Sequence, residues 1–189
     1  MNIGFKEAMD RQVFDCFIFH DVDLLPEDDR NPHTCPEVGM PRHLSVSIDI
    51  FGYMYSRLCN KTIHYALTKT IQSTSPIGEN HFGGVVSMAT ADFVAVNGFS
   101  NSFWGWGGED DDLFQRIRAR NLTVQRHRPL RESRYTMLPH DPAEPNPNRK
   151  RILKQNNGAQ SDGLANLKYR RLDVQLHYLF TRITVEILP

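Results

Sequence analysis

Residues 13–23 read VFDCFIFHDVD and carry the main indication of the fold. Val13 to Phe19 form a short apolar run rich in residues that favour β-strands, and the run ends abruptly at the polar HDVD sequence. We therefore predict a buried strand that delivers acidic side chains at its carboxyl end. Ligands of open α/β sheets bind at that end of the strands, so the segment predicts both a fold class and the place of a site.

Further strand patterns recur along the chain. Leu44–Ile48 alternates as expected for a strand with one buried face. Gly83–Thr90 reads as another strand, entered through a tight backbone passage at its glycines. Three more strands are predicted at 122–128, 134–138 and 182–188.

A helix is predicted from Glu109, with acidic residues in its first turn and basic residues in its last turn, as the helix dipole favours. The apolar positions at helical spacing are Leu113, Phe114 and Ile117. The basic positions, which are expected to face water, are Arg116, Arg118 and Arg120.

The remaining segments are predicted as a short helix, a loop and an insertion. Thr90 is expected to cap a short helix that ends at Gly98. Residues 140–163 are rich in Pro and Asn and are expected to form a mobile functional loop. Met54–Asn80 has no clean period and is predicted to be a surface insertion.

Composition excludes several classes of function. The chain has 189 residues, enough for one domain, and its 22 basic residues balance 22 acidic ones, so no overall field attracts nucleic acid or an anionic membrane. No apolar run approaches the ~20 residues of a membrane helix, and the first residues lack the apolar core of a signal peptide. Three cysteines leave open one disulfide with a free thiol, or three thiols.

Asp21 and Asp23 place two carboxylates on the same side of an extended segment that follows the predicted strand. Such a pair suits a divalent cation that carries phosphate oxygens, because hard cations prefer oxygen ligands and leave positions open for substrate. The alternative is a polar strand end without a ligand.

Residues 103–114, FWGWGGEDDDLF, combine four consecutive acids with two tryptophans and three glycines. Two acids would suffice for a helix start, so the excess indicates a cation, a polyhydroxyl ligand or open water. Indole rings present apolar faces to sugar C–H groups, and glycines let a ligand approach the backbone. The stretch therefore favours sugar recognition, although one tryptophan could belong to the core.

Met137 and His140 lie where a predicted strand meets the Pro-rich loop. By residue type alone both favour a structural interpretation, because methionine is usually a core residue and a lone histidine seldom binds a metal. Methionine is also an unusual ligand for a hard cation.

Several motifs together resemble the β-1,4-galactosyltransferase family, in the order found in that family. They are CFIFHDVDLLPEDDRN, PRHLSVSIDIFGY, HFGGVVSM, NGFSNSFWGWGGEDDDLFQRI, EPNPNR, SDGLANLKY and ITVEI. The resemblance covers residues 1–54 and 81–187. It implies a GT-A-type α/β fold, Rossmann-like with a mixed sheet, of which residues 1–189 would be the carboxyl-terminal portion of a single catalytic domain.

The resemblance also implies a reaction, in which Mn²⁺ assists inverting transfer of galactose from UDP-galactose to the 4-hydroxyl of a terminal N-acetylglucosamine. Asp110 falls on the general base of the family. The implied metal ligands are Asp23, Met137 and His140. The implied contacts of the UDP-sugar donor are Asp21, Val22, His81, Gly84 and Trp106, with Trp106 on a mobile loop that closes over the donor. The implied contacts of the glycan acceptor are Gly107, Gly108, Asp111 and Arg149.

Charges around Asp110 are expected to act in opposite directions. Repulsion from its acidic neighbours would raise the pKa of its carboxyl, and the helix dipole would lower it. Glu109 and Asp112 are assigned only electrostatic support.

Cellular location follows from the same resemblance. It implies that Cys16 and Cys35 form a disulfide, and it implies a Golgi membrane protein with its catalytic part in the lumen, although this chain carries no anchor or signal. The expected partners are a UDP-sugar and a glycan, without nucleic acid.

Three alternatives remain open at this point. His81 stands where the family tunes its donor sugar, so UDP-N-acetylgalactosamine could replace UDP-galactose. An inactive carbohydrate-binding fragment is the second alternative. A metal-dependent phosphohydrolase is the third, and it leaves the WGWGG sequence without a role.

Overall fold

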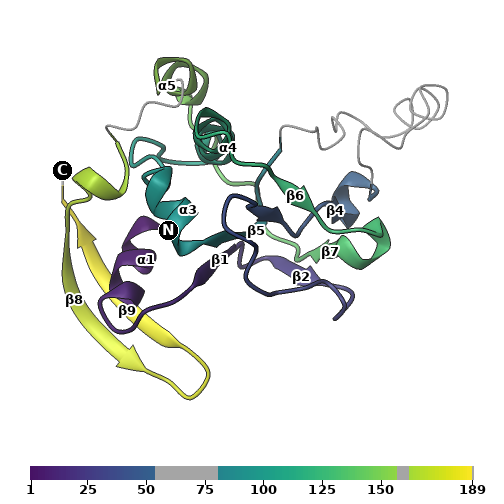
Figure 1. Cartoon of the computed structure of the whole chain (residues 1–189). Helices are drawn as coiled ribbons and strands as arrows, with labels where there is room; N and C mark the ends of the chain where they lie inside the picture. The colour runs from purple at the N-terminus through teal and green to yellow at the C-terminus, as the bar shows by residue number, and fades with distance from the viewer. Residues whose placement is uncertain (54–80, 157–161, 189) are drawn as a thin grey trace.

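The computed structural model describes residues 1–53, 81–156 and 162–188 (Figure 1). The insertion predicted at Met54–Asn80 lies outside the described residues. In chain order the helices and strands are α1 (Asn2–Met9), β1 (Cys16–His20), β2 (Leu24–Pro26), β3 (Arg42–His43), β4 (Ser47–Ile48), β5 (Val85–Ala89), α3 (Thr90–Ala95), α4 (Glu109–Ala119), β6 (Gln125–Arg126), β7 (Arg134–Met137), α5 (Arg149–Asn156), β8 (Tyr169–Leu176) and β9 (Thr181–Ile187). Short 3-10 turns are η1 (Asp49–Phe51), η2 (Leu130–Ser133) and η3 (Leu164–Asn166).

Two small sheets form the centre of the molecule, and both are mixed as predicted. In the first sheet the strand order is β1-β5-β3-β6; β5 runs antiparallel to β1 and β3, and β3 runs parallel to β6. In the second sheet the order is β2-β7-β4, with β7 antiparallel to β2 and parallel to β4. Figure 1 shows α4 next to this centre and α5 beyond it.

Strand β5 separates the two halves of the core, and all five of its residues are buried. Successive side chains of a strand point to opposite faces. Val86 and Met88 accordingly belong to a cluster with α3 and α4 residues, whereas Val85 packs with Leu24 and Tyr135. The strand predicted at Val13–Phe19 is present as β1, but it is an edge strand and none of its residues is fully buried; Phe17 and Phe19 pack against one part of the core and Ile18 against the other.

The strand predicted at Leu44–Ile48 is divided between the two sheets. The amides of Leu44 and Ser45 both donate to the carbonyl of Val85, at 2.9 and 3.3 Å, and the chain then leaves β5 to pair with β7. Leu44 and Val46 are fully buried. The alternating pattern therefore reflects a buried passage between sheets rather than one continuous strand.

Helix α4 begins at Glu109, as predicted, and buries Leu113 and Ile117. Arg116, however, does not face water: its side chain is fully buried, and its Nε donates to Asp112 Oδ2 at 2.6 Å. The prediction for Arg116 is wrong because helical spacing shows that Asp112 and Arg116 can pair, but it does not show that the pair is buried or that carbonyls of Gly98 and Asp162 accept from Arg116.

Two further predictions from local sequence are wrong. Thr90 is the first residue of α3 and caps nothing; its hydroxyl donates to the carbonyl of Phe14 at 2.5 Å. The segment predicted to be a loop at 140–163 contains the helix α5. Gly98 does follow α3 in a left-handed conformation, with φ of 64°, as expected of a helix end.

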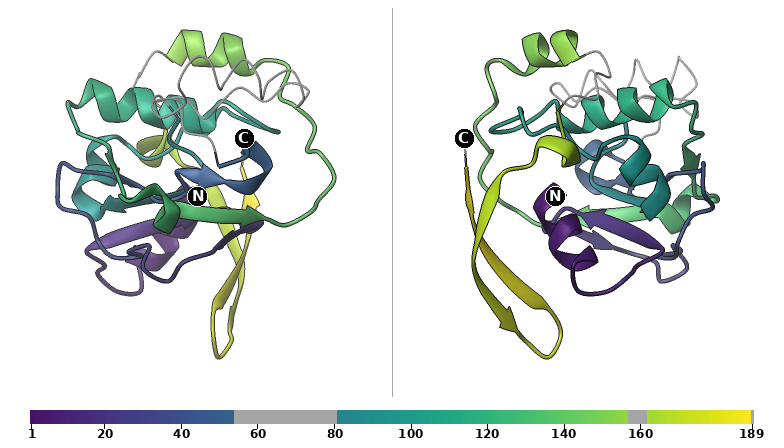
Figure 2. Two further views of the ribbon diagram at one scale, coloured as in Figure 1. Left: turned by 90° about the vertical axis from the view of Figure 1, so that its right-hand side faces the viewer. Right: turned by 60° about the vertical axis from the view of Figure 1, so that its left-hand side comes forward.

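The hairpin of β8 and β9 projects from the body of the molecule in all three views (Figures 1 and 2). It is attached through Glu7 of α1, which is 2% exposed. Glu7 accepts hydrogen bonds from the hydroxyl of Tyr169 at 2.8 Å and from Arg171 and Arg11, both at 3.1 Å.

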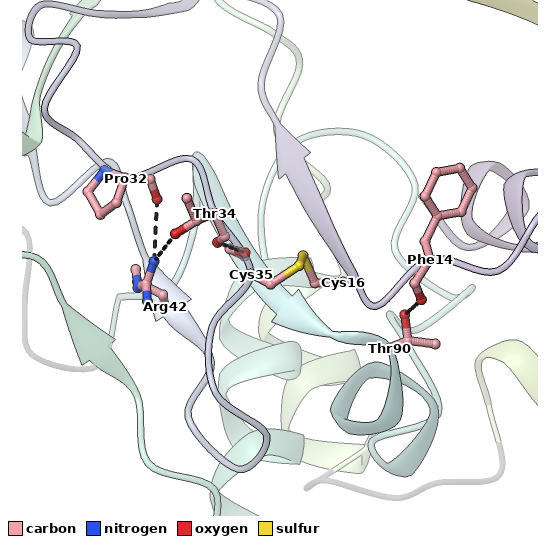
Figure 3. The surroundings of a disulfide bond; sticks show 8 residues. Phe14, Cys16, Pro32, Thr34, Cys35, Arg42 and Thr90 are labelled. Carbon is pink, nitrogen blue, oxygen red and sulfur yellow. Dashed lines mark hydrogen bonds between the residues drawn. A yellow bond between two sulfur atoms is a disulfide. The ribbon is translucent and has the colours of Figure 1, made fainter.

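Cys16 and Cys35 form a disulfide that closes the segment between them, as the resemblance implied (Figure 3). The bond joins the start of β1 to the loop before β3. Arg42 supports the same loop through the Thr34 hydroxyl, at 3.1 Å. The disulfide and Arg42 thus hold the loop before β3 against the first sheet.

Candidate functional site

The Asp21–Asp23 segment is a tight turn between the two sheets. The amide of Asp21 donates to the carbonyl of Gly84 at 3.0 Å, and the amide of Leu24 donates back to the carbonyl of Asp21 at 3.2 Å. Asp23 is held from the other side, because its carbonyl accepts from the amide of Leu138 at 2.7 Å. Val22 projects into solvent, with 95% of its surface exposed. The turn therefore has a backbone fixed by hydrogen bonds from both sides.

Asp23 and His140 lie in contact, with 2.9 Å between Asp23 Oδ2 and His140 Nε2. His140 Nδ1 lies 2.8 Å from the carbonyl of Asp141, so a proton on Nδ1 leaves the Nε2 lone pair directed at the carboxylate. A backbone carbonyl is the usual orienting partner of a histidine that binds metal. The pair is therefore suited to share a proton or a divalent cation.

Met137 is the third residue that the resemblance assigns to the metal, and its place in the sheet is next to Asp23. It lies at the end of β7 opposite Leu24, the residue after Asp23, and its side chain is half-buried. Within the described residues, no three His, Cys, Asp or Glu side chains form a group that could hold a metal ion. Among the residues that the structure describes, a third ligand would have to be of another type, such as the thioether of Met137.

Asp110 is the second residue of α4 and packs directly on the backbone of Gly83. A Cβ added at Gly83 would lie 2.1 Å from Asp110 Oδ2 and 3.0 Å from the His81 ring. Only glycine permits this approach. The close contact explains why the Gly-Gly pair precedes β5 and why Asp110 and His81 flank the same point of the backbone.

The environment of Asp110 raises the pKa of its carboxyl to about 8. Burial is the largest cause, followed by repulsion from Glu109, Asp21 and Asp111. The pKa of Asp21 is raised to about 6, because the surrounding protein partly desolvates a carboxylate that still touches solvent, and because Asp23 and Glu109 repel it. The opposing effects expected from the sequence are thus resolved in favour of a raised pKa for Asp110.

Glu109 stands between the two acids whose pKa values are raised. One of its carboxylate oxygens, Oε2, is buried without a hydrogen-bond partner. A buried, unpartnered carboxylate oxygen is costly, and it marks a position where a ligand group could donate a hydrogen bond.

His81 packs edge-on against the buried ring of His43, with 5.4 Å between the ring centroids. Burial is the main cause that lowers the pKa of the His81 imidazole, so the ring is neutral at pH 7. Its carbonyl accepts from Arg126 at 3.0 Å, which fixes the backbone before Phe82. A neutral histidine therefore forms part of the wall beside Asp110.

Trp106, on the segment before α4, and Arg149, the first residue of α5, form another group. The guanidinium of Arg149 lies 5.1 Å from the centroid of the Trp106 ring, and 58% of Trp106 is exposed. The Trp106 amide donates to the carbonyl of Glu144, and its carbonyl accepts from Asn146, at 3.0 and 2.9 Å. Gly107 and Gly108 both have positive φ, and a Cβ at either would approach the Arg149 side chain at 3.1–3.2 Å.

The predicted residues therefore fall into three neighbouring groups, namely Asp23 with His140, Asp110 with Asp21 and His81, and Trp106 with Arg149. Asp21 links the first group to the second, because its carboxylate repels those of both Asp23 and Asp110. Asp111 is exposed at the start of α4, and Gly84 adjoins Ser45 and Leu24 instead of the acids. Two cavities of about 590 and 490 Å³ lie beside the β8–β9 hairpin, and none of the predicted site residues lines either.

Sequence reasoning missed two residues of this site. Gly83 was not singled out, although the doubled glycine before a predicted strand was a usable signal. Glu109 was assigned only electrostatic support, because the sequence cannot show that one of its oxygens is buried without a partner.

Comparison with known families finds two matches. A profile described as "N-terminal region of glycosyl transferase group 7" matches residues 1–36, and one described as "N-terminal domain of galactosyltransferase" matches residues 71–141.

Among proteins of known function, the chain is 41% identical to beta-1,4-galactosyltransferase 2 of Cricetulus griseus over 192 residues. It is 39% identical to beta-1,4-galactosyltransferase 1 of Mus musculus over 191 residues. Both alignments cover 99% of this chain, and they cover 46% and 42% of the relatives. The chain thus spans less than half the length of these relatives.

Two solved structures share the fold. The catalytic domain of Drosophila beta-1,4-galactosyltransferase 7 in complex with xylobiose matches with a TM-score of 0.72 at 26% identity. A mutant of that enzyme in complex with manganese, UDP-Gal and xylobiose matches with a TM-score of 0.73 at 25% identity. Each match covers 100% of this chain and 73% of the other. The predicted GT-A-type fold is confirmed, and no helix in the described ranges has the length and apolar character needed to cross a membrane.

Proposed function

Because the chain belongs to the β-1,4-galactosyltransferase family, we propose that it transfers galactose from UDP-galactose to the 4-hydroxyl of a terminal N-acetylglucosamine, with inversion. The observation that carries this proposal is the Asp110 carboxylate, packed on Gly83 with its pKa raised to about 8. A general base works best when its pKa lies near the working pH.

Asp110 acts as the base on the acceptor hydroxyl. The hydroxyl oxygen attacks the anomeric carbon of the donor sugar, the bond from that carbon to the diphosphate breaks, and UDP leaves with the bonding electrons. The proton of the hydroxyl passes to an Asp110 oxygen. Burial strengthens this interaction, since water does not compete for the carboxylate.

Asp23, His140 and Met137 are proposed to hold Mn²⁺, which would neutralise the diphosphate of the donor. The convergence of Asp23 Oδ2 and His140 Nε2 supports the assignment. Manganese and UDP-Gal occur together in the complex of the Drosophila enzyme. In this chain the turn at Asp21–Asp23, fixed by Gly84 and Leu138, orients the ligands from both sides.

The donor is proposed to lie along Asp21, Val22, His81, Gly84 and Trp106, and the acceptor along Gly107, Gly108, Asp111 and Arg149. An exposed indole with open backbone beside it suits the apolar face of a sugar ring. The exposed Trp106 ring, with Arg149 over it, directly precedes Gly107 and Gly108 and so provides an indole beside open backbone.

The test is Asp110→Asn, with Asp173→Asn in the exposed β8 strand as the matched control. We expect Asp110→Asn to lower kcat at least ~100-fold, because general bases contribute on that order, and to leave binding of UDP with Mn²⁺ unchanged. Asp173→Asn should keep wild-type turnover. Normal turnover in Asp110→Asn would overturn the assignment of the base.

A second candidate is transfer of N-acetylgalactosamine, which the His81 wall favours. The neutral His81 ring packs edge-on against His43 and flanks the same backbone point as Asp110. Competition between equal concentrations of UDP-galactose and UDP-N-acetylgalactosamine decides between the two donors. If the chain binds an N-acetylglucosamine glycan but shows no Mn²⁺-dependent affinity for UDP by calorimetry, it is instead a non-catalytic carbohydrate-binding protein.

We also propose that residues 1–189 form the carboxyl-terminal portion of one catalytic domain, with an insertion at 54–80, located in the Golgi lumen. The Cys16–Cys35 disulfide supports an oxidising compartment.

A further inference from the structure

The segment that carries Trp106 is attached at its start to one carboxylate, that of Asp162. The Asn101 amide donates to both Asp162 oxygens at 3.1 Å, the Ser102 hydroxyl donates to Oδ2 at 2.9 Å, and the Ser100 hydroxyl donates to Oδ2 as well. Three consecutive residues are thus held by a residue about 60 positions away in the chain.

The same residue is tied to α4 through Arg116. Arg116 Nη1 donates to the backbone carbonyl of Asp162 at 2.6 Å and to the carbonyl of Gly98 at 3.4 Å, while its Nε pairs with Asp112. Arg116 and Asp112 are fully buried. Asp162 and Arg116 therefore connect the two ends of the Trp106 segment, namely residues 100–102 at its start and the first turn of α4 at its end.

Asn156 extends the network to α5. Its side-chain amide donates to Asp112 Oδ1 at 3.1 Å and to the Ser100 hydroxyl at 3.2 Å. Helix α5 begins with Arg149, the residue that stacks on Trp106. The anchor thus reaches both partners of that stack.

Between these two ends the segment has few contacts of its own. Gly105, Gly107 and Gly108 all have positive φ, and Trp106 is paired only with the 144–146 backbone and Arg149 among the contacts that the structure shows. Glycines of this kind permit movement, so the position of Trp106 depends on how firmly the ends are held.

From this geometry we infer that Asp162 is a positioning residue for sugar transfer: with Arg116 and Asp112 it anchors both ends of the 100–108 segment and so sets Trp106 relative to Asp110. The inference rests on the proposed function for its catalytic part. The anchor needs a carboxylate, because four donated hydrogen bonds converge on it and an amide would present an N–H group to one of the donors. Burial alone would raise the pKa of the Asp162 carboxyl, but the hydrogen bonds from Ser100, Asn101 and Ser102 outweigh it and lower the pKa.

The experiment compares Asp162→Asn with Asp173→Asn. Asp173 also accepts two local hydrogen bonds, from the Val174 amide and the Gln175 side chain, but it lies in the exposed hairpin. Ser100→Ala serves as a second variant that removes one donor and keeps the carboxylate. Thermal unfolding of each protein confirms that it is folded.

Two readouts report on the segment without requiring activity. Hydrogen exchange of the peptide that covers residues 100–108 measures protection of the Asn101 amide. Tryptophan fluorescence reports only on this segment, because Trp104 and Trp106 are the two tryptophans of the chain. Asp162→Asn should accelerate exchange at least ~10-fold and change the fluorescence response to UDP-galactose with Mn²⁺; Ser100→Ala should do so more weakly and Asp173→Asn not at all.

The third readout is kinetic. A small misplacement of a positioned group costs up to about 100-fold in rate, so we expect kcat of Asp162→Asn to fall about 10- to 100-fold with little change in the KM of the acceptor. Unchanged exchange in Asp162→Asn overturns the anchor. Faster exchange with unchanged kcat overturns the positioning role. A folded wild-type chain that transfers no sugar overturns the proposed function and the catalytic part, while the exchange comparison still decides the anchor.

Discussion

At Asp110, withdrawal from water contributes more to the raised pKa than repulsion from Glu109, Asp21 and Asp111 does. The helix start would favour the ionised form, and the structure shows that this effect does not prevail. The carboxylate is buried because Gly83 has no side chain, so the chemistry of Asp110 depends on a residue 27 positions earlier in the sequence.

The pH dependence of transfer follows from this environment. An Asp110 with a pKa raised to about 8 is protonated, and inactive as a base, below that pH, so kcat/KM should rise with pH and level off above about 8. Glu109→Gln removes one cause of the shift and should move the inflection to lower pH. Rate profiles from pH 6 to 9 for both proteins provide the measurement, and an inflection that Glu109→Gln leaves in place would contradict the explanation.

At the scale of one element, α4 combines a face that the sequence predicted with one that it did not. Leu113 and Ile117 are buried as their spacing indicates, because an apolar stripe determines which side of a helix meets the core. Arg116 lies on the buried side as well, paired with Asp112 and bonded to carbonyls of Gly98 and Asp162. Asp112 lies one turn away on the same helix, but the two carbonyls are 18 and 46 positions away in the chain, and no local pattern contains them.

Arg116→Met should lower the free energy of unfolding by roughly 3–5 kcal/mol, because Asp112 would remain buried without its counter-ion. Arg118→Met, on the exposed side of the same helix, should change it by less than ~0.5 kcal/mol. Urea denaturation measures both. Equal effects for the two variants would show that the buried pair does not stabilise α4.

At the scale of the whole molecule, long-range attachments hold the small sheets and the projecting hairpin together. The Cys16–Cys35 disulfide joins β1 to the loop before β3, and Glu7 joins α1 to β8. The disulfide attaches the loop before β3 to an edge strand, and Glu7 attaches the projecting hairpin to α1. A two-stranded hairpin is marginally stable by itself, so the contact with Glu7 decides where it lies.

Loss of the disulfide should destabilise the protein. The two cysteines are 19 positions apart, and closing a loop of this size is worth ~3 kcal/mol through the entropy of the unfolded chain. The double variant with Cys16→Ser and Cys35→Ser should therefore unfold at lower urea concentration than wild type. Reductant should lower the midpoint of wild type and leave that of the double variant unchanged; a wild-type midpoint insensitive to reductant would contradict the prediction.

Glu7→Gln should loosen the hairpin, because the amide cannot match the charged hydrogen bonds of a carboxylate that is 2% exposed. Hydrogen exchange in β8 and β9 should become faster. Glu186→Gln is the control: Glu186 pairs with Arg170 on the exposed face, and surface pairs of this kind contribute little. If the two variants exchange equally, Glu7 does not attach the hairpin.

The sequence by itself determined where α4 begins, which residues form the central strand β5, and which polar side chains are candidates for the site. These features depend on local periodicity, on turn residues and on the identity of side chains, all of which are written in short stretches. Even the disulfide partners could be named from the resemblance of such stretches to a family.

Only the tertiary structure decided how the four consecutive acids differ: Asp112 is fully buried beside Arg116, Asp110 packs on Gly83 with its pKa raised to about 8, and Asp111 is exposed. It also decided that Leu44–Ile48 is divided between two sheets, that residues 149–156 form a helix, and that Arg116 is inside. Burial, desolvation and the pairing of distant hydrogen-bond partners are properties of the assembled molecule. The FWGWGGEDDDLF stretch therefore contains candidate site residues, and the contacts of Asp110 with Gly83 and of Asn101 and Ser102 with Asp162 come only from the assembled molecule.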